Sequence, residues 1–463
     1  MLFNSLPFLF LFLPITYFVF WKLSSRDARY FWLALTGYLF YSFWNYKFCA
    51  LMAFSTLVSF LGGLGLQRWP EKCWKRKLSL ALPITLDLLL LGFFKYVNFV
   101  IDTANNIAAT MGADWAAKSI NIILPVGISF YTFHTISYVV DCYRGVVKPT
   151  RNLLEFACYV SLFPQLVAGP IVRFRQIEAD LEDIDRSKGA GQLDLGWSYF
   201  TLGMIEKVLI ADSIALIINP ALENYRELST ISAWLCVLGY TYQLYFDFLG
   251  YSDMAVGLGH LFGLRIPQNF NSPYKATDIS DFWRRWHISL STCLRDYLYI
   301  PLGGNRVSPF RTRLNLMLTM LFGGLWHGAS WTFVFWGGYH GALLMCLQYF
   351  DKRWQSFHVN LRRVFTFLVV IIGWVFFRSD SFGMALALLA KMFIWESGKM
   401  MPGIGFLSVL LAVAAYFAHV ASNSWEISHE WSGREILFLT VMFVVCLLVI
   451  VGGKATPFLY FQF

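Results

Sequence analysis

The chain has 463 residues, of which 57% are hydrophobic, 19% are aromatic and only 14% are charged. These fractions exclude an ordinary soluble domain and indicate an integral membrane protein. The formal net charge of +9 could reflect nucleic-acid binding. In so apolar a chain, however, basic residues more simply flank membrane spans on the cytoplasmic side, and we expect no nucleic-acid partner.

Apolar runs long enough to form membrane helices recur from end to end. In chain order they cover residues 6–21, 30–46, 48–66, 78–100, 122–143, 153–172, 196–222, 231–250, 314–350, 364–377, 381–395, 405–422 and 435–451. No alternating ten-residue pattern of a membrane barrel competes with them. We therefore predict an all-α polytopic membrane protein, a bundle of about eleven to thirteen transmembrane helices.

The basic loops set the orientation of these spans. Lysines and arginines follow the runs 6–21, 48–66 and 122–143, which makes those loops cytoplasmic and puts the N-terminus outside. No positive charge precedes the first run and no small-residue cleavage site follows it. We therefore expect it to be a retained span rather than a signal peptide.

Two runs depart from simple crossings. The run 153–172 contains Pro164 and a Gly169-Pro170 pair, which predicts a broken, re-entrant segment that returns to the side it left. The run 314–350 would be roughly 55 Å long as a single helix, too long for one crossing and suited to a hairpin. The charged segment 265–313 before it is predicted to be cytoplasmic.

We treat residues 1–463 as a single membrane domain. Its N-terminal spans occupy 1–150, a motif-bearing core occupies 151–350, and C-terminal spans occupy 351–463. The eight cysteines form no CxxC pair, so neither a disulfide framework nor a zinc site is expected. No HExxH, GxSxG or Walker motif is present, which argues against a metalloenzyme, a serine hydrolase and an ATPase.

The segment 275–313 carries a net excess of four basic residues. Ordinary positive-inside flanking explains part of it, and a face for an anionic headgroup or a phosphorylated donor explains it equally well. Aromatic residues interleave the charges in FWRRWH, residues 282–287, as in a helix lying at the membrane interface. On a helix, Asp281 and Arg285 would pair, while PLGGNR, residues 301–306, predicts a turn.

His327 lies in LFGGLWHGASW, inside the almost uncharged run 314–350. A hydrogen-bonded structural histidine is the common alternative. The neighbouring glycines leave room around the ring, and ionisable groups at membrane depth are usually retained for a reaction or a pathway. Imidazole can also take a proton from a hydroxyl near neutral pH, which makes a catalytic role the alternative to a structural one. His340 and His134 could be structural or line the same cavity. Four more histidines fit interface or loop positions: His260, His358, His419 and His429.

Six motifs carry a family resemblance. They are FPQLVAGPIVRF, FDFLGYSDMA, NFNSPY, DFWRRWHISLS, RDYLYIPLGGNR and LWHGASWTFVFWGGYHG, spread over residues 163–341. In this order they closely resemble the membrane-bound O-acyltransferase family, in particular its bacterial branch that acetylates exported polysaccharides such as alginate and cellulose. The ending ATPFLYFQF fits the same branch. Cys293 departs from the pattern, where a tryptophan would be expected.

The resemblance implies a bundle with re-entrant and interfacial helices around a central funnel or tunnel, in the bacterial inner membrane. It also implies that His327 is the catalytic histidine and His287 the second characteristic histidine. His327 would act as general base or as a transient acyl carrier, and His287 could donate a hydrogen bond to the oxyanion. No tightly bound cofactor and no metal are implied.

The resemblance further implies acetyl-CoA as the acyl donor, arriving from the cytoplasm. The donor's phosphates would contact cytoplasmic arginines, for which the candidates are Arg284, Arg285, Arg295 and Arg306. The acceptor would be a polysaccharide, reached directly or through a periplasmic acetyltransferase or other proteins of a polysaccharide-export complex. Membrane lipid is the remaining partner.

Three other functions fit the residues. A multipass transporter would use His327, His340 and Asp247 along a proton or solute path. An acyltransferase for another envelope polymer, such as one that D-alanylates teichoic acid, would take its donor from a carrier protein. A membrane anchor that recruits periplasmic enzymes would need neither His327 nor His287.

Overall fold

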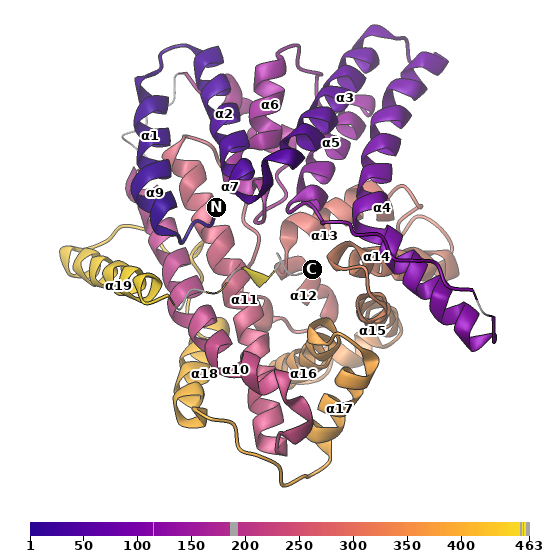
Figure 1. Ribbon diagram of the computed structural model, residues 1–463, viewed down its shortest axis with the longest axis vertical. Helices are drawn as coiled ribbons and strands as arrows, with labels where there is room; N and C mark the ends of the chain where they lie inside the picture. The colour runs from indigo at the N-terminus through magenta and orange to yellow at the C-terminus, as the bar shows by residue number, and fades with distance from the viewer. Residues whose placement is uncertain (114, 186–192, 454–455, 457, 460–463) are drawn as a thin grey trace. The chain divides into compact units, whose positions relative to one another are not determined.

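The computed structural model describes residues 1–463 except 114, 186–192, 454–455, 457 and 460–463. Its regular structure is helical throughout this described part, apart from one isolated bridge between Leu228 and Lys399 (Figure 1). The chain forms two compact units, Met1–Leu193 with Leu258–Pro267, and Asp194–Gly257 with Gln268–Phe463. The prediction of an all-α polytopic membrane protein is confirmed.

The first unit is built from short and long helices packed pairwise. They are η1 (Phe8–Phe12), α1 (Leu13–Lys22), α2 (Arg26–Asn45), η2 (Tyr46–Phe48), α3 (Cys49–Arg68), α4 (Trp74–Thr110), α5 (Ile128–Tyr143), α6 (Leu153–Ser161), α7 (Phe163–Leu166) and α8 (Phe174–Glu182). Asp87 on α4 is buried, and hydroxyls of Ser55 and Thr135 donate to its carboxylate at 2.6 and 2.7 Å. The carboxylate thus ties α4 to both α3 and α5.

Two predictions in this unit have different outcomes. The break in 153–172 is confirmed, because α6 ends before Pro164 and the chain after α7 turns through Gly169 at a φ of 104°. The run 122–143 begins its helix late, at Ile128. Pro125 and Gly127, whose φ is 75°, hold the preceding residues out of the helical conformation.

The second unit contains the remaining elements, except that Leu193 of α9 and the last four residues of α11 belong to the first unit. They are α9 (Leu193–Met204), η4 (Ile205–Asp212), α10 (Ser213–Glu223), η5 (Tyr225–Glu227), α11 (Thr230–Leu261), η6 (Pro273–Lys275), α12 (Ile279–Arg285), α13 (Ile288–Leu294), η7 (Arg295–Tyr299), α14 (Pro309–His327), α15 (Trp331–Gln355), α16 (Val359–Arg378), α17 (Phe382–Phe393), α18 (Ile404–His419) and α19 (Gly433–Val451). Element η4 is a π-helical stretch that continues α9 into α10, so the run 196–222 is one continuous helical rod.

The hairpin predicted for 314–350 is confirmed. Helices α14 and α15 lie side by side (Figure 1) and are joined by three residues, 328–330. A Cβ at Gly324 would lie 2.2 Å from the Phe333 carbonyl oxygen, and one at Gly337 would lie 2.3 Å from the Met320 oxygen. The glycines of this stretch therefore allow the two backbones to touch.

Two predicted boundaries in the second unit are wrong. Helix α11 does not end near residue 250 but continues to Leu261, because residues 251–261 contain no proline and their side chains are almost all buried. The run 381–395 forms a helix too short to cross a bilayer by itself. Its helix α17 has 12 residues, about 18 Å at 1.5 Å per residue, against a hydrocarbon core of roughly 30 Å.

The contacts of α17 support this correction. Just before its start, Arg378 at the end of α16 and Asp380 line one cavity with Glu223 at the end of α10. Just after its end, the Glu396 N–H donates to Thr230 Oγ1 at 2.9 Å. Both ends of α17 therefore lie near residues 223–230, as expected for a helix that stays on one side.

Among the described residues, four helical stretches are long and apolar enough to cross a membrane by length and composition. They are Arg26–Arg68, Trp74–Thr110, Val359–Arg378 and Gly433–Val451. The last of these is mostly exposed, with 11% of its window buried, as expected for a helix that faces lipid.

Candidate functional site

His327 is the last residue of α14, and its side chain is buried. The helix ends there because Gly328 is extended, and Ser330 then caps α15 by accepting the Thr332 N–H at 3.2 Å. The imidazole ring meets two aromatic rings edge-on, Trp336 at 5.2 Å and Phe377 at 5.1 Å. A short turn between two close-packed helices therefore holds this ring among aromatic side chains.

His287 lies between α12 and α13 with a φ of 42°, an uncommon conformation for a residue with a side chain. Its Nδ1–H donates to Asn269 Oδ1 at 3.1 Å, and the same oxygen accepts from Ser289 Oγ at 2.8 Å. Asn269 Nδ2 donates to Ser252 Oγ at 3.3 Å, which supports this amide orientation. Burial lowers the pKa of His287 to about 3, so the ring is neutral.

This hydrogen bond sets which ring nitrogen of His287 carries the proton. With the proton on Nδ1, the other nitrogen, Nε2, carries a lone pair and accepts rather than donates. The arrangement therefore disagrees with a role as oxyanion donor and suits a group that accepts a hydrogen bond or a proton. Trp326 lies between the two predicted histidines, with its ring 5.8 Å from His287 and 5.0 Å from His327.

His340 belongs to the same aromatic cluster. It is fully buried on α15, and its ring lies 4.8 Å from Trp336 and 5.2 Å from Trp283. Because Trp336 also contacts His327, these contacts connect the two imidazoles through one indole. His134 lies in the first unit, on α5, where it packs 5.6 Å from Tyr159.

The four predicted arginines have different surroundings. The predicted pair of Arg285 with Asp281 is present at 3.0 Å, and Arg285 also donates to the Asn271 carbonyl at 3.2 Å. Its guanidinium thus serves the fold of this segment. The side chains of Arg284 and Arg295 are 65% and 58% exposed, and Arg306 is exposed in the turn predicted for 301–306. These three can reach a ligand from solvent.

A polar cavity of about 510 Å³ opens beside His327. Its lining is Asn219, Glu223, Gly328, Ala329, Ser330, Thr332, Phe333, Phe377, Arg378, Ser379, Asp380 and Leu459. The three connections that form it, after α10, α14 and α16, are all on the outer side in the charge-based topology. Two carboxylates against one guanidinium, with amide and hydroxyl groups, suit a hydroxyl-rich ligand.

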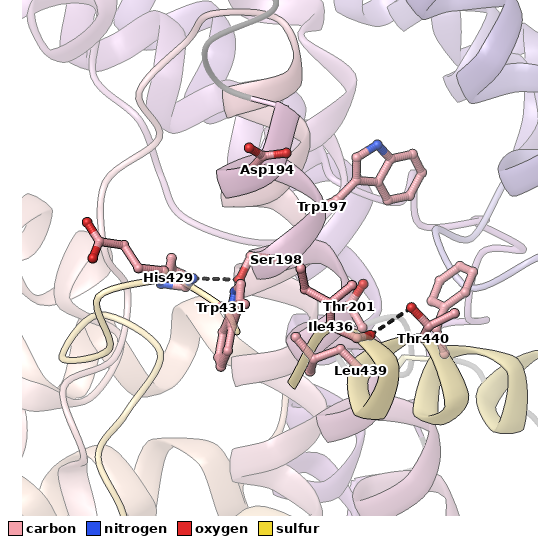
Figure 2. A pocket seen from close by; sticks show the side chains of 11 residues that line it. Asp194, Trp197, Ser198, Thr201, His429, Trp431, Ile436, Leu439 and Thr440 are labelled. Carbon is pink, nitrogen blue, oxygen red and sulfur yellow. Dashed lines mark hydrogen bonds between the residues drawn. The ribbon is translucent and has the colours of Figure 1, made fainter. Parts of the chain in front are cut away.

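A second cavity, of about 520 Å³, lies between α9, α19 and the residues leading into α19 (Figure 2). There the Ser198 hydroxyl donates to His429 Nδ1 at 2.6 Å and accepts from Trp431 Nε1 at 2.8 Å. His429 Nε2–H donates to the Ser424 carbonyl at 2.7 Å. The predicted loop position of His429 is confirmed, and its hydrogen bonds fasten that loop to α9.

The sequence interpretation missed Lys207 and Asp212, and gave Asp247 a place in a transport path. Lys207 Nζ lies 2.6 Å from a carboxylate oxygen of both Asp212 and Asp247, and all three side chains are at most 2% exposed. Lys207 follows Glu206 directly and precedes Asp212 by five residues in an apolar run, and this spacing does not indicate a pair. The two acids are 35 positions apart in the printed sequence.

The comparisons with known proteins agree with this all-helical membrane architecture. The family model described as MBOAT, membrane-bound O-acyltransferase family, matches residues 146–389. The probable alginate O-acetylase AlgI of Pseudomonas putida is 40% identical over 500 residues, with 100% of both chains covered. The Azotobacter vinelandii protein of the same name is 45% identical over 395 residues, covering 85% of this chain and 78% of that one.

A third relative, the peptidoglycan O-acetyltransferase of Helicobacter pylori, is 34% identical over 490 residues, covering 97% of this chain and 88% of the relative. The protein is thus a multi-pass acyltransferase of the bacterial inner membrane. It belongs to the membrane-bound O-acyltransferase family, as the sequence motifs indicated.

Proposed function

We propose that this protein moves an acetyl group from cytoplasmic acetyl-CoA to a hydroxyl of an exported polysaccharide, with His327 as the general base. One observation carries the proposal. His327 is the last residue of helix α14, which starts at the basic segment that we predict to be cytoplasmic. Its ring lies beside a polar cavity at the other end of this helix. Helix α14 has 19 residues, about 28 Å at 1.5 Å per residue, so this histidine can serve an acceptor from the outer side.

The chemistry requires one proton acceptor and a stabilised oxyanion. His327 takes the proton of the acceptor hydroxyl as its oxygen attacks the thioester carbonyl. A C–O bond forms, the C–S bond breaks, and the proton passes to the departing thiolate. His287, neutral and with Nε2 as an acceptor, orients a donor group near the reacting atoms rather than holding the oxyanion. The aromatic side chains around His327 keep bulk water from the thioester.

Two buried indole N–H groups of the aromatic cluster that includes His340 support a path for the pantetheine arm of acetyl-CoA. The indole N–H groups of Trp286 and Trp336 are buried and have no hydrogen-bond partner among the residues that the structure describes. Such groups cost free energy unless something accepts from them. Amide carbonyls of a pantetheine arm would do so. The donor's phosphates would then lie near the exposed guanidiniums of Arg284, Arg295 and Arg306.

The acceptor is proposed from two supports. The relatives are named for O-acetylation of alginate and of peptidoglycan, both of which are carbohydrate polymers. The cavity beside His327 presents Asn219, Glu223 and Arg378, side chains that hydrogen-bond sugar hydroxyls. The acetyl group is passed either directly to the polymer or first to a periplasmic acetyltransferase of an export complex.

The test measures the O-acetyl content of exopolysaccharide from cells that carry the wild-type protein, His327→Ala or His287→Ala. Immunoblots of membranes establish equal protein levels. We expect acetylation to be lost with His327→Ala and reduced less with His287→Ala. His358→Ala is the matched control, because His358 is exposed just before α16, and it should acetylate normally. Retained acetylation in His327→Ala would refute the proposal.

Free thiol release separates this function from transport. Purified protein given acetyl-CoA and an acceptor polysaccharide should release CoA thiol in step with acetyl ester formed, and His327→Ala should release none above background. Solute movement without thiol release would favour the transporter.

A further inference from the structure

The ion cluster of Lys207, Asp212 and Asp247 is unusual in a chain this apolar. Its three side chains are almost completely buried, and one lysine neutralises only one of two carboxylates. Burying such a group is expensive unless its remaining lone pairs and protons are satisfied. Other groups of the chain must therefore form hydrogen bonds with these lone pairs and protons.

Every member of the cluster bonds to the chain beyond α19. Lys207 Nζ donates to the Thr456 carbonyl at 3.2 Å, and the Thr456 hydroxyl donates to Asp212 Oδ1. The Leu459 N–H donates to Asp247 Oδ2 at 2.9 Å. Two backbone groups and one hydroxyl therefore complete the cluster, and we call Thr456, Phe458 and Leu459 the docked residues.

The middle docked residue is fixed by aromatic packing. The Phe458 ring is 1% exposed and stacks on Tyr251 at 4.8 Å with an angle of 27° between the planes. It also lies 5.7 Å from Phe248. The docked residues are therefore held inside the second unit by hydrogen bonds to charged side chains on both sides of the stacked Phe458 ring.

The docked residues lie close to the surroundings of both histidines of the proposed site. Phe248, which contacts Phe458, lies edge-on to the His287 ring at 4.7 Å. Leu459 lines the cavity beside His327 together with Gly328. The docked residues thus form one wall that touches the surroundings of His287 and the acceptor cavity of His327.

We infer that Lys207, Asp212 and Asp247 are positioning residues for acyl transfer, because they hold the docked residues as a wall of the acyl-transfer site. This inference rests on the proposed function of that site. None of the three touches the reacting groups. They act by fixing the shape of the cavity in which the acceptor hydroxyl meets His327.

A purely structural role is the alternative, and the chain offers a matched control. Lys391 on α17 is also buried, and its Nζ donates to Glu396 at 2.9 Å and to the Leu228 carbonyl at 3.1 Å. The bond to Leu228 joins α17 to the α10–α11 connection, and neither bond involves the docked residues. Lys391→Met therefore removes a buried lysine of the same kind without disturbing the wall.

The experiment compares Thr456→Val, Lys207→Met and Lys391→Met in the full-length protein. Thr456→Val keeps the shape of the side chain and removes only the hydroxyl, so it spares the helices. Amide hydrogen exchange at Leu459 reports whether the docked residues stay in place, and O-acetyl content in cells reports transfer. We expect about ten-fold faster exchange at Leu459 and at least a five-fold loss of acetylation in the first two variants, and neither change in Lys391→Met.

Each other outcome overturns the inference. Unchanged exchange at Leu459 in Lys207→Met would mean that the cluster does not hold the docked residues. Faster exchange with normal acetylation would mean that the wall does not serve transfer. Equal loss of acetylation in Lys391→Met, with slow exchange at Leu459, would assign the effect to general stability. Failure of the proposed function is separate, since it appears as normal acetylation in His327→Ala.

Discussion

Replacing Gly324 by alanine tests whether the close contact of α14 and α15 sets the position of His327. The added Cβ would lie 2.2 Å from the Phe333 carbonyl oxygen, which is backbone and cannot rotate away. Reaching an ordinary contact distance of about 3.4 Å requires the helices to separate by roughly 1 Å. Gly324 is three residues before His327, so this displacement reaches the ring. A misplacement of about 1 Å can lower a rate about 100-fold.

We therefore expect Gly324→Ala to lower the rate of thiol release from acetyl-CoA by roughly 30- to 100-fold, with the protein still folded in detergent. The assay follows CoA thiol with purified protein at saturating donor, and thermal denaturation checks the fold. The steric conflict should also lower stability, by about 1–3 kcal/mol.

Gly338→Ala is the matched control on the same helix pair. A Cβ there meets only Leu321 Cδ2 at 3.5 Å, an ordinary contact. Its rate should be normal, and its stability unchanged or raised by up to about 1 kcal/mol, because alanine favours a helix over glycine. If Gly324→Ala matched Gly338→Ala in both rate and stability, the close helix contact would not position His327.

Three further predictions concern single side chains. His287 has a lowered pKa when folded, so the unfolded chain binds a proton there that the native chain does not, and this residue's contribution to stability falls by about 1.4 kcal/mol per pH unit as pH drops below about 6.5. His287→Gln should reduce the slope of stability against pH by about this amount in thermal melts between pH 7 and 5, and an unchanged slope would contradict the neutral buried ring. Ser198→Ala leaves the Trp431 indole and His429 Nδ1 without their shared hydroxyl and should cost about 1–3 kcal/mol in denaturant titrations; a wild-type midpoint would mean that these bonds do not fasten the loop. Arg284→Ala should raise the KM for acetyl-CoA several-fold at low salt and little at high salt, because its guanidinium is exposed; an equal effect at both ionic strengths would argue against a phosphate contact.

Local patterns in the sequence predicted a large part of the second unit. The uncharged run 314–350 between basic residues was enough to predict the α14–α15 hairpin and to place His327 near the end of its first arm. The spacing of Asp281 and Arg285 was enough to predict their pair. Each of these features depends on residues within about one hairpin of each other, where helical periodicity and charge decide the geometry.

Features that depend on distant contacts could not be predicted in this way. The apolar run 381–395 resembles a span in composition, and only the position of both its ends near residues 223–230 indicates that it stays on one side. The orientation of His287 depends on Asn269 and on a backbone φ of 42°, neither of which a motif reveals. Lys207 meets Thr456 across 249 positions of sequence, and no periodicity links such a pair.

The shape of α17 has a consequence for how the acyl group crosses the membrane. Because α17 stays on one side, the connections at residues 223–230 and 378–380 and the turn at 328–330 all lie at one end of the second unit, around the cavity beside His327. The basic segment before α14 lies at the other end, about 24 Å away along a helix in which 16 residues separate Arg311 from His327. A donor held by its phosphates at the basic end would need only an extended arm to bring its thioester to the ring. The charged donor could thus remain on the cytoplasmic side while the acetyl group alone reaches the acceptor, which avoids moving a polyanion through the hydrocarbon core.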